Sequence, residues 1–176
     1  MDKGAVCVRN YSTILYSSMI VICFICGVLC YQLFDMAQIE QVITIFDRRL
    51  LTMEKPTWIW SVVPFLVGIS IVLFFSTHQY LAKIALVFIA LKMTFFGLSS
   101  VFLLVQHDSV KLYAFWWFPF QFLYGVLLIM LYEVMKRQQS TRALKRALPI
   151  KKVLLLLFVF GFLGTIENFA ITYLFK

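Results

Sequence analysis

The chain of 176 residues has the length of one compact domain, but 62% of its residues are hydrophobic and only 14% are charged. Soluble domains have roughly 45–50% apolar and about 25% charged residues, and a water-soluble chain of this composition would expose apolar patches that aggregate. The composition therefore excludes a soluble enzyme and a disordered chain, and it indicates an integral membrane protein with a net charge of +8.

Five apolar stretches are long enough, or nearly so, to cross a bilayer as α-helices, which takes about 20 residues. The first, residues 14–34, is uncharged and longer than the core of a signal peptide, so we expect an uncleaved helix. Trp58 and Trp60 open the second at an interfacial position, and Pro64 and Gly68 are expected to bend it. The sequence predicts an all-α integral membrane protein whose five transmembrane helices form one bundle, a single membrane domain over residues 1–176, with spans at about 14–34, 58–76, 81–105, 112–135 and 153–175.

An outer segment, residues 35–57, separates the first two spans. Its apolar residues recur at helical spacing among polar and charged ones, which predicts an amphipathic helix lying on the membrane surface or against a partner. Glu54-Lys55-Pro56 ends this helix. The residues that carry the spacing are Ile39, Val42, Ile43, Ile45 and Phe46.

The distribution of Lys and Arg sets the orientation of the chain. With the N-terminus inside, most basic residues face the cytoplasm and most acidic residues fall outside, so the positive-inside rule predicts an N-terminus inside and a C-terminus outside. The inner basic linker, residues 136–152, faces anionic lipid head groups, either as a topology determinant or as a docking patch for a cytoplasmic partner, and no nucleic acid is expected. Its basic residues are Lys136, Arg137, Arg142, Lys145, Arg146, Lys151 and Lys152.

Lys92 in the third span and Glu167 in the fifth are functional candidates, because an ionisable residue inside the bilayer is energetically costly. Both spans run from inside to outside, and the two residues lie about 14 Å and about 22 Å along them from the inner basic residues. The difference of about 8 Å is within reach of two extended side chains, so we expect Lys92 and Glu167 to pair. With Gln121 and Asn168 as further polar candidates, the pair either fixes helix packing or lines a polar path.

Two local patterns concern helix packing. Gly97-Leu98-Ser99-Ser100 offers a small face on which a neighbouring helix can approach closely. Pro119 frees a backbone carbonyl at membrane depth, and the amide of Gln121 lies close enough in sequence to help satisfy polar groups there.

Signatures of catalysis are lacking. The sequence contains no Gly-rich phosphate loop, no H-E-x-x-H and no G-x-S-x-G, and His78 and His107 are expected on opposite sides of the membrane, where they cannot share a metal. Cys23-Phe24-Ile25-Cys26 lies in an apolar run without a second ligand pair. We therefore expect that the protein is not an enzyme and that it binds neither a cofactor nor a metal.

The order of these features resembles the stage II sporulation protein M family, also known as DUF95. The matching features are Gly27 in the first span, Leu91-Lys92-Met93-Thr94-Phe95-Phe96-Gly97 in the third, and Pro119 and Gln121 in the fourth. The ending, residues 164–172, resembles the family's G-x-x-x-E-x-x-x-T, with the glutamate one position earlier in this chain, at Glu167. The chain departs from the pattern where Met93 replaces a glycine and Phe120 interrupts the Pro-Gln pair.

The resemblance implies a non-enzymatic scaffold or assembly subunit in the bacterial cytoplasmic membrane. In sporulating bacteria such proteins anchor peptidoglycan-degrading partners, and short relatives accompany circular bacteriocin gene sets, with roles in maturation, export or immunity. Expected partners are the lipid bilayer and a peptidoglycan hydrolase, an ATP-binding cassette subunit or a bacteriocin. The alternative is a transporter or permease component that moves a small or peptide substrate through a polar path near Lys92 and Glu167.

Overall fold

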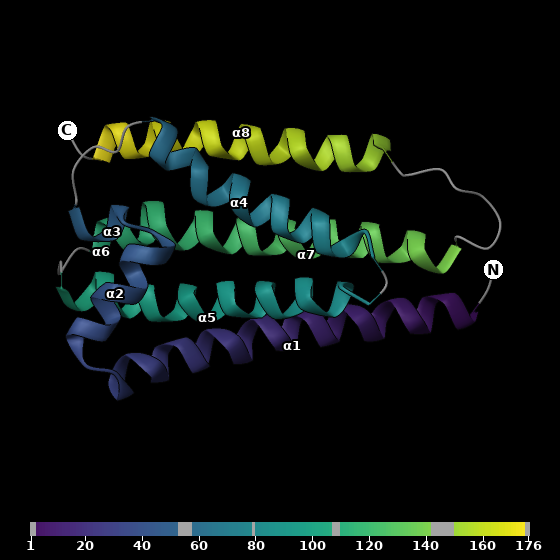
Figure 1. The fold of residues 1–176 in the computed structure, drawn as a ribbon, viewed down its shortest axis with the longest axis horizontal. Helices are drawn as coiled ribbons and strands as arrows, with labels where there is room; N and C mark the ends of the chain where they lie inside the picture. Colours follow the sequence, from purple (N-terminus) through teal and green to yellow (C-terminus); the bar gives the residue numbers. More distant parts are fainter. Residues whose placement is uncertain (1–2, 53–57, 79, 107–109, 142–149, 175–176) are drawn as a thin grey trace.

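The computed structural model describes residues 3–52, 58–78, 80–106, 110–141 and 150–174. Every regular element in these ranges is helical, which confirms the all-α prediction. The elements are α1 (Lys3–Leu33), α2 (Met36–Phe46), α3 (Arg49–Thr52), α4 (Trp58–Ser76), α5 (Ala82–Gln106), α6 (Val110–Leu112), the π-helical turn η1 (Tyr113–Trp117), α7 (Phe118–Thr141) and α8 (Ile150–Leu174). The long helices lie side by side along one axis, and α2 and α3 lie across one end of them (Figure 1).

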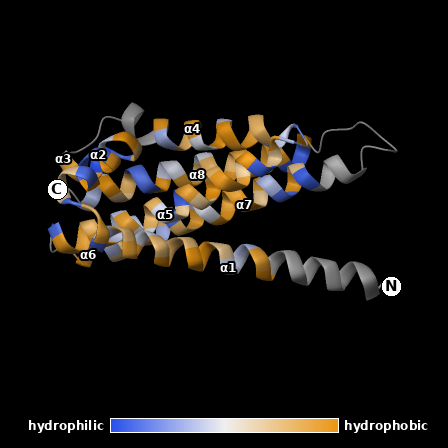
Figure 2. Ribbon diagram, turned by 60° about the horizontal axis from the view of Figure 1, so that its bottom comes forward, coloured by the Kyte–Doolittle hydropathy of each residue, from blue (hydrophilic) through white to orange (hydrophobic). Residues whose placement is uncertain are grey.

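Among the described residues, four helical stretches are long and apolar enough to cross a membrane. They match the first, third, fourth and fifth predicted spans, and their bounds are Ile14–Leu33, Ala82–Gln106, Val110–Lys136 and Ile150–Tyr173. Helix α4 has the bounds expected for the second span, and Val63–Ser76 within it is an apolar helical stretch. Apolar residues dominate the length of the bundle, and hydrophilic ones are concentrated towards its ends (Figure 2).

Helices α1 and α5 approach each other closely, through one glycine on each. A Cβ atom added to Gly27 would collide with the carbonyl oxygen of Thr94 and lie 2.8 Å from the backbone nitrogen of Leu98, and one added to Gly97 would collide with the carbonyl of Phe24. The small face predicted at residues 97–100 is therefore confirmed as a site of close helix approach, as expected where packing between membrane helices depends on small residues.

The outer segment folds back onto the bundle of its own chain. Ile39 and Ile43 of α2 are buried, and the Phe46 ring stacks on Phe95 of α5 with centroids 4.9 Å apart. The sequence predicted this amphipathic helix correctly, but Ile39 and Ile43 on its apolar face are buried within the chain itself rather than lying free for the membrane surface or a partner. The segment is therefore part of the core at this end of the molecule.

The basic linker is shorter than predicted, because helices extend into it from both sides. Helix α7 continues to Thr141 and α8 begins at Ile150, so only residues 142–149 separate them. Lys136, Lys151 and Lys152 are exposed on the helix ends, and Arg137 belongs to α7. Arg142, Lys145 and Arg146 lie outside the described residues.

Candidate functional site

A buried charge cluster, formed by Asp47, Arg49 and Glu167, joins the outer segment to α8. The Arg49 guanidinium donates from Nε to Asp47 Oδ1 at 2.8 Å, from Nη2 to Asp47 Oδ2 at 2.6 Å and from Nη1 to Glu167 Oε1 at 3.0 Å. All three residues are at most 5% exposed. This is the fork-like donor geometry that makes arginine the preferred partner of buried carboxylates.

Two aromatic side chains complete the surroundings of Glu167. Trp116 Nε1 donates to Oε1 at 3.0 Å, and the Tyr124 hydroxyl donates to Oε2 at 2.9 Å, so protein groups bind both carboxylate oxygens. The rings of Trp116 and Phe65 lie 5.7 Å and 5.6 Å from the Arg49 guanidinium carbon, within cation–π range. The cluster thus connects α3, α4, η1, α7 and α8.

The chain places Arg49 by a tight turn at the end of α2. Asp47 ends the helix with its backbone N–H bonded to the Ile43 carbonyl at 2.8 Å, and its Oδ1 accepts the backbone N–H of Arg49 at 3.2 Å. Burial alone lowers the pKa of the Arg49 guanidinium, but the carboxylates of Asp47 and Glu167 raise it above its ordinary value, so Arg49 stays charged. Glu167 lies seven residues before the end of α8, so Arg49 reaches about 10 Å into the bundle.

The π-helical turn η1 positions Trp116. The turn is closed by the Phe118 N–H, which bonds to the Tyr113 carbonyl, and Pro119, which has no N–H to donate, follows directly. A π-turn rotates successive side chains less than an α-turn does, and here the adjacent Trp116 and Trp117 are both buried. The expected backbone irregularity near Pro119 therefore takes the form of a widened turn that directs one indole at Glu167.

The predicted ion pair between Lys92 and Glu167 is wrong. Glu167 pairs with Arg49, and the Lys92 ammonium instead lies 5.8 Å from the centroid of the Phe46 ring. The depth estimate treated Arg49 as a residue of an outer segment on the membrane surface, whereas the turn after α2 carries it into the bundle. A guanidinium with several donors then satisfies Glu167 together with Trp116 and Tyr124.

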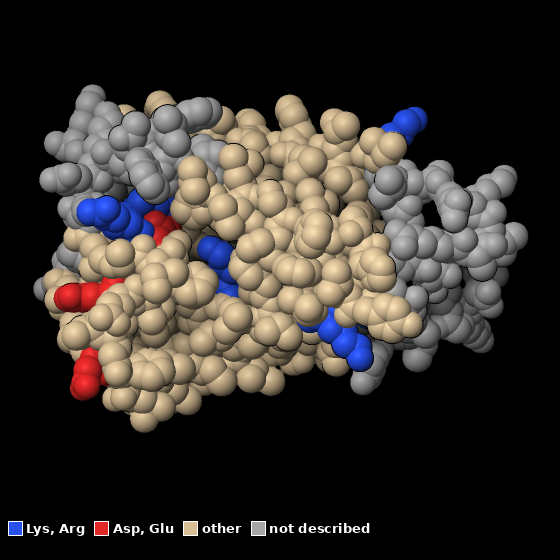
Figure 3. Space-filling model, viewed as in Figure 1, with Lys and Arg blue, Asp and Glu red and all other residues tan. Residues whose placement is uncertain are grey.

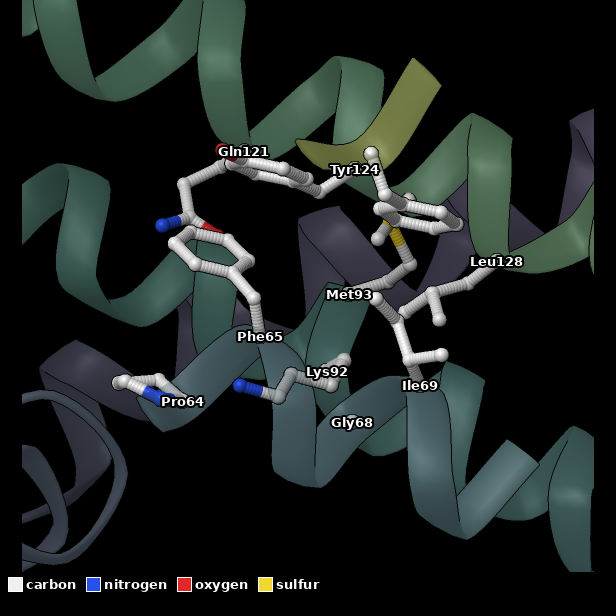
Figure 4. A pocket seen from close by; sticks show the side chains of 11 residues that line it. Pro64, Phe65, Gly68, Ile69, Lys92, Met93, Gln121, Tyr124 and Leu128 are labelled. Carbon is white, nitrogen blue, oxygen red and sulfur yellow. The ribbon is translucent and has the colours of Figure 1, made fainter. Parts of the chain in front are cut away.

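Lys92 and Gln121 do come together, at a small cavity of about 20 Å³ between α4, α5, α7 and α8. Lys92, Gln121 and Tyr124 are its polar lining residues (Figure 4). Tyr124 also bonds to Glu167, so the cavity adjoins the buried charge cluster. On the face seen in Figure 3, mostly uncharged residues cover the middle of the molecule, and basic side chains reach the surface among them.

Among the described residues, no recorded contact joins the remaining polar candidates, Asn168 and His78, to this site. Asn168 is half-buried next to Glu167, and its backbone carbonyl accepts the Thr172 hydroxyl at 2.9 Å. His78 is exposed, and His107 lies outside the described residues. Over the described ranges, no group of three or more His, Cys, Asp or Glu side chains is placed to hold a metal ion.

Sequence reasoning missed Asp47, Arg49, Trp116 and Tyr124 as members of the site. One signal for them was available, because a buried carboxylate requires a counter-charge and the Asp-x-Arg turn follows directly on an amphipathic helix.

No protein family, no curated protein and no solved structure matches this chain.

Proposed function

We propose that this chain is a non-enzymatic membrane scaffold or assembly subunit of a bacterial envelope machine, as its resemblance to the stage II sporulation protein M family implies. The observation that carries the proposal is that groups of the protein itself bind both carboxylate oxygens of Glu167 in the buried charge cluster. Glu167 is 2% exposed and accepts hydrogen bonds from Arg49, Trp116 and Tyr124. A catalytic or substrate-binding carboxylate keeps an oxygen accessible, whereas a carboxylate that fixes packing is bound on all sides.

We propose five spans, with α4 as the second of them, an N-terminus inside and a C-terminus outside. The starts of α1, α5 and α8 lie at one end of the bundle and α2 and α3 at the other, an arrangement that supports this topology (Figure 1). The exposed residues Lys83, Lys136, Lys151 and Lys152 belong to the first end, as the positive-inside rule requires of a cytoplasmic face.

Cysteine labelling tests this topology. In a background without the native cysteines, a membrane-impermeant maleimide applied to intact cells should label Glu54→Cys, and it should label Lys145→Cys only after the membrane is opened. The reverse pattern, or labelling of both positions in intact cells, overturns the orientation.

Two surfaces are available to partners under this proposal. Outside, α2 is anchored by Arg49, and it presents Glu40, Gln41, Thr44 and Ile45 as exposed residues. Inside, the basic helix ends around residues 136 and 152 suit an acidic cytoplasmic partner or anionic lipid. The partners we propose are a peptidoglycan hydrolase, an ATP-binding cassette subunit or a bacteriocin.

Affinity purification from the native host in mild detergent tests the scaffold role. Recovery with a peptidoglycan hydrolase or with an ATP-binding cassette subunit supports it and distinguishes the two machines. Recovery of a lone monomer that catalyses substrate-dependent flux in proteoliposomes overturns it. That second result would favour a permease component, the alternative supported by the cavity at Lys92 and Gln121.

A further inference from the structure

The cavity between α4, α5, α7 and α8 holds two polar side chains that the buried charge cluster does not use. Within the described part of the chain, neither the Lys92 ammonium nor the Gln121 amide has a hydrogen-bond or ion-pair partner. Their nitrogen atoms point to the same side, one on each side of the Phe65 ring (Figure 4). Phe65, Ile69, Leu128 and Phe160 are among the apolar walls.

These groups need a hydrogen-bond acceptor. An ammonium has three donors, and the nearby Phe46 ring interacts with its charge without replacing an acceptor oxygen. Tyr124 uses its proton for Glu167, so its hydroxyl oxygen still accepts. A ligand that satisfies all three groups must accept from Lys92 and Gln121 and donate to Tyr124.

Charge and volume restrict that ligand. The carboxylates of Asp47 and Glu167 already balance the cations Arg49 and Lys92, so an anion would leave one uncompensated negative charge in the bundle. The cavity volume of about 20 Å³ exceeds the roughly 10–15 Å³ that one water molecule requires. Water is neutral, both accepts and donates, and normally has two to four polar partners in such sites.

We propose that this cavity is a hydrated site that binds one or two water molecules, which join Lys92 and Gln121 to Tyr124 and through it to Glu167. The polar groups inside the bundle then form one hydrogen-bonded unit from Lys92 to Arg49. The inference holds whether the protein is a scaffold or a permease component.

Solid-state NMR of the full chain in lipid bilayers tests the site directly. With isotope-labelled lysine, and with the Lys92 signal assigned by its loss in Lys92→Met, magnetisation transfer from water protons should reach the Lys92 nitrogen. Transfer from lipid acyl chains or protein protons alone overturns the proposal. So does an ion-dependent shift of this signal when chloride is exchanged for gluconate, because that result identifies an anion site.

A glycine pair provides a matched control. Gly68 lines the cavity, and a Cβ added there meets only Phe88, at 3.9 Å, whereas one added to Gly161 of α8 meets nothing within 4 Å. We expect Gly68→Ala to reduce the water transfer to Lys92 at least two-fold and Gly161→Ala to leave it unchanged. Equal transfer in the two variants contradicts the proposed place of the water.

A double-mutant cycle between Lys92→Met and Tyr124→Phe tests the connection to the charge cluster. Because Tyr124→Phe removes a hydroxyl and no charge, we expect a coupling of roughly three- to thirty-fold in the unfolding equilibrium constant. The exposed Lys83→Met, paired with the same tyrosine change, should be additive within about two-fold. Additivity of both pairs overturns the hydrogen-bonded unit, and the NMR measurement on the unmodified chain decides the matter if a variant fails to fold.

Discussion

Replacing Arg49 by methionine tests whether the buried charge cluster holds the outer segment in the bundle. Methionine keeps most of the side-chain volume and removes the charge together with three hydrogen bonds to Asp47 and Glu167. We expect a loss of about 3–5 kcal/mol in the free energy of unfolding, the range observed when one partner of a buried ion pair is removed.

The magnitude follows from what Glu167 and Asp47 retain. Glu167 keeps the donors of Trp116 and Tyr124, and Asp47 keeps the backbone N–H of Arg49, so neither carboxylate is stripped of all hydrogen bonds. The remaining cost arises because both negative charges stay buried without the guanidinium that forms an ion pair with each of them. We therefore expect a value near the lower end of the range, about 3 kcal/mol, or roughly a hundred-fold change in the unfolding equilibrium constant.

Denaturation with sodium dodecyl sulfate in mixed micelles, followed by circular dichroism, measures this difference. Arg48→Met is the matched control, since Arg48 is the exposed neighbour and its replacement should change stability by less than about 0.5 kcal/mol. Adding Glu167→Gln to Arg49→Met should cost at least about 1 kcal/mol less than the sum of the single changes, because it removes one of the stranded charges. Equal stability of the two arginine variants, or strict additivity with Glu167→Gln, refutes the role assigned to Arg49.

Further substitutions test the packing around this cluster, with the same denaturation measurement as the assay. Gly27→Ala should destabilise by about 1–3 kcal/mol because its Cβ meets the backbone of α5, whereas Gly161→Ala should be neutral or slightly stabilising, and the opposite order contradicts the close helix contact. Trp116→Phe should cost about 1–2 kcal/mol more than Trp117→Phe, because the Trp116 indole donates to Glu167 while Trp117 Nε1 has no partner in the described ranges. Equal costs would contradict the role of Trp116 in the site. Ile43→Ala should cost about 2–5 kcal/mol if α2 belongs to the core. A cost below about 1 kcal/mol would indicate instead that α2 lies on the membrane surface.

The bounds of the long helices could be predicted because they follow from the lengths of the apolar runs, which can be read from the sequence. The predicted bounds of the third span, 81–105, differ by one residue from α5, Ala82–Gln106, and those of the second span coincide with α4. Helix ends extend further where the flanking residues are polar but good helix formers, as at the start of α8. Glycine was also informative, because Gly97 lies in a face of small residues that packs against a neighbouring backbone.

The partner of Glu167 was not accessible to the same reasoning. Arg49 is 118 residues away in sequence, and its depth depends on a turn that folds back into the bundle rather than on the length of an apolar run. An estimate of depth along the helix axes assumes that every loop lies outside the hydrocarbon. It therefore paired Lys92 with Glu167, two charged residues that lie inside predicted spans. The π-turn before Pro119 was hidden for a similar reason, since it depends on hydrogen bonding across one turn and not on hydropathy.

The cluster also determines how the outer segment is presented. A short amphipathic helix held only by apolar contacts can rotate and slide on a lipid surface, because hydrophobic association is non-directional. The two bonds from Arg49 to Asp47 and the third to Glu167 fix the C-terminal end of α2 relative to α8, while Ile39 and Ile43 fix its buried face. The opposite face, with Ile45 80% exposed, is therefore held in one orientation. A rigidly oriented surface reduces the entropy lost on binding, which is what the proposed assembly role requires of a face that binds a partner.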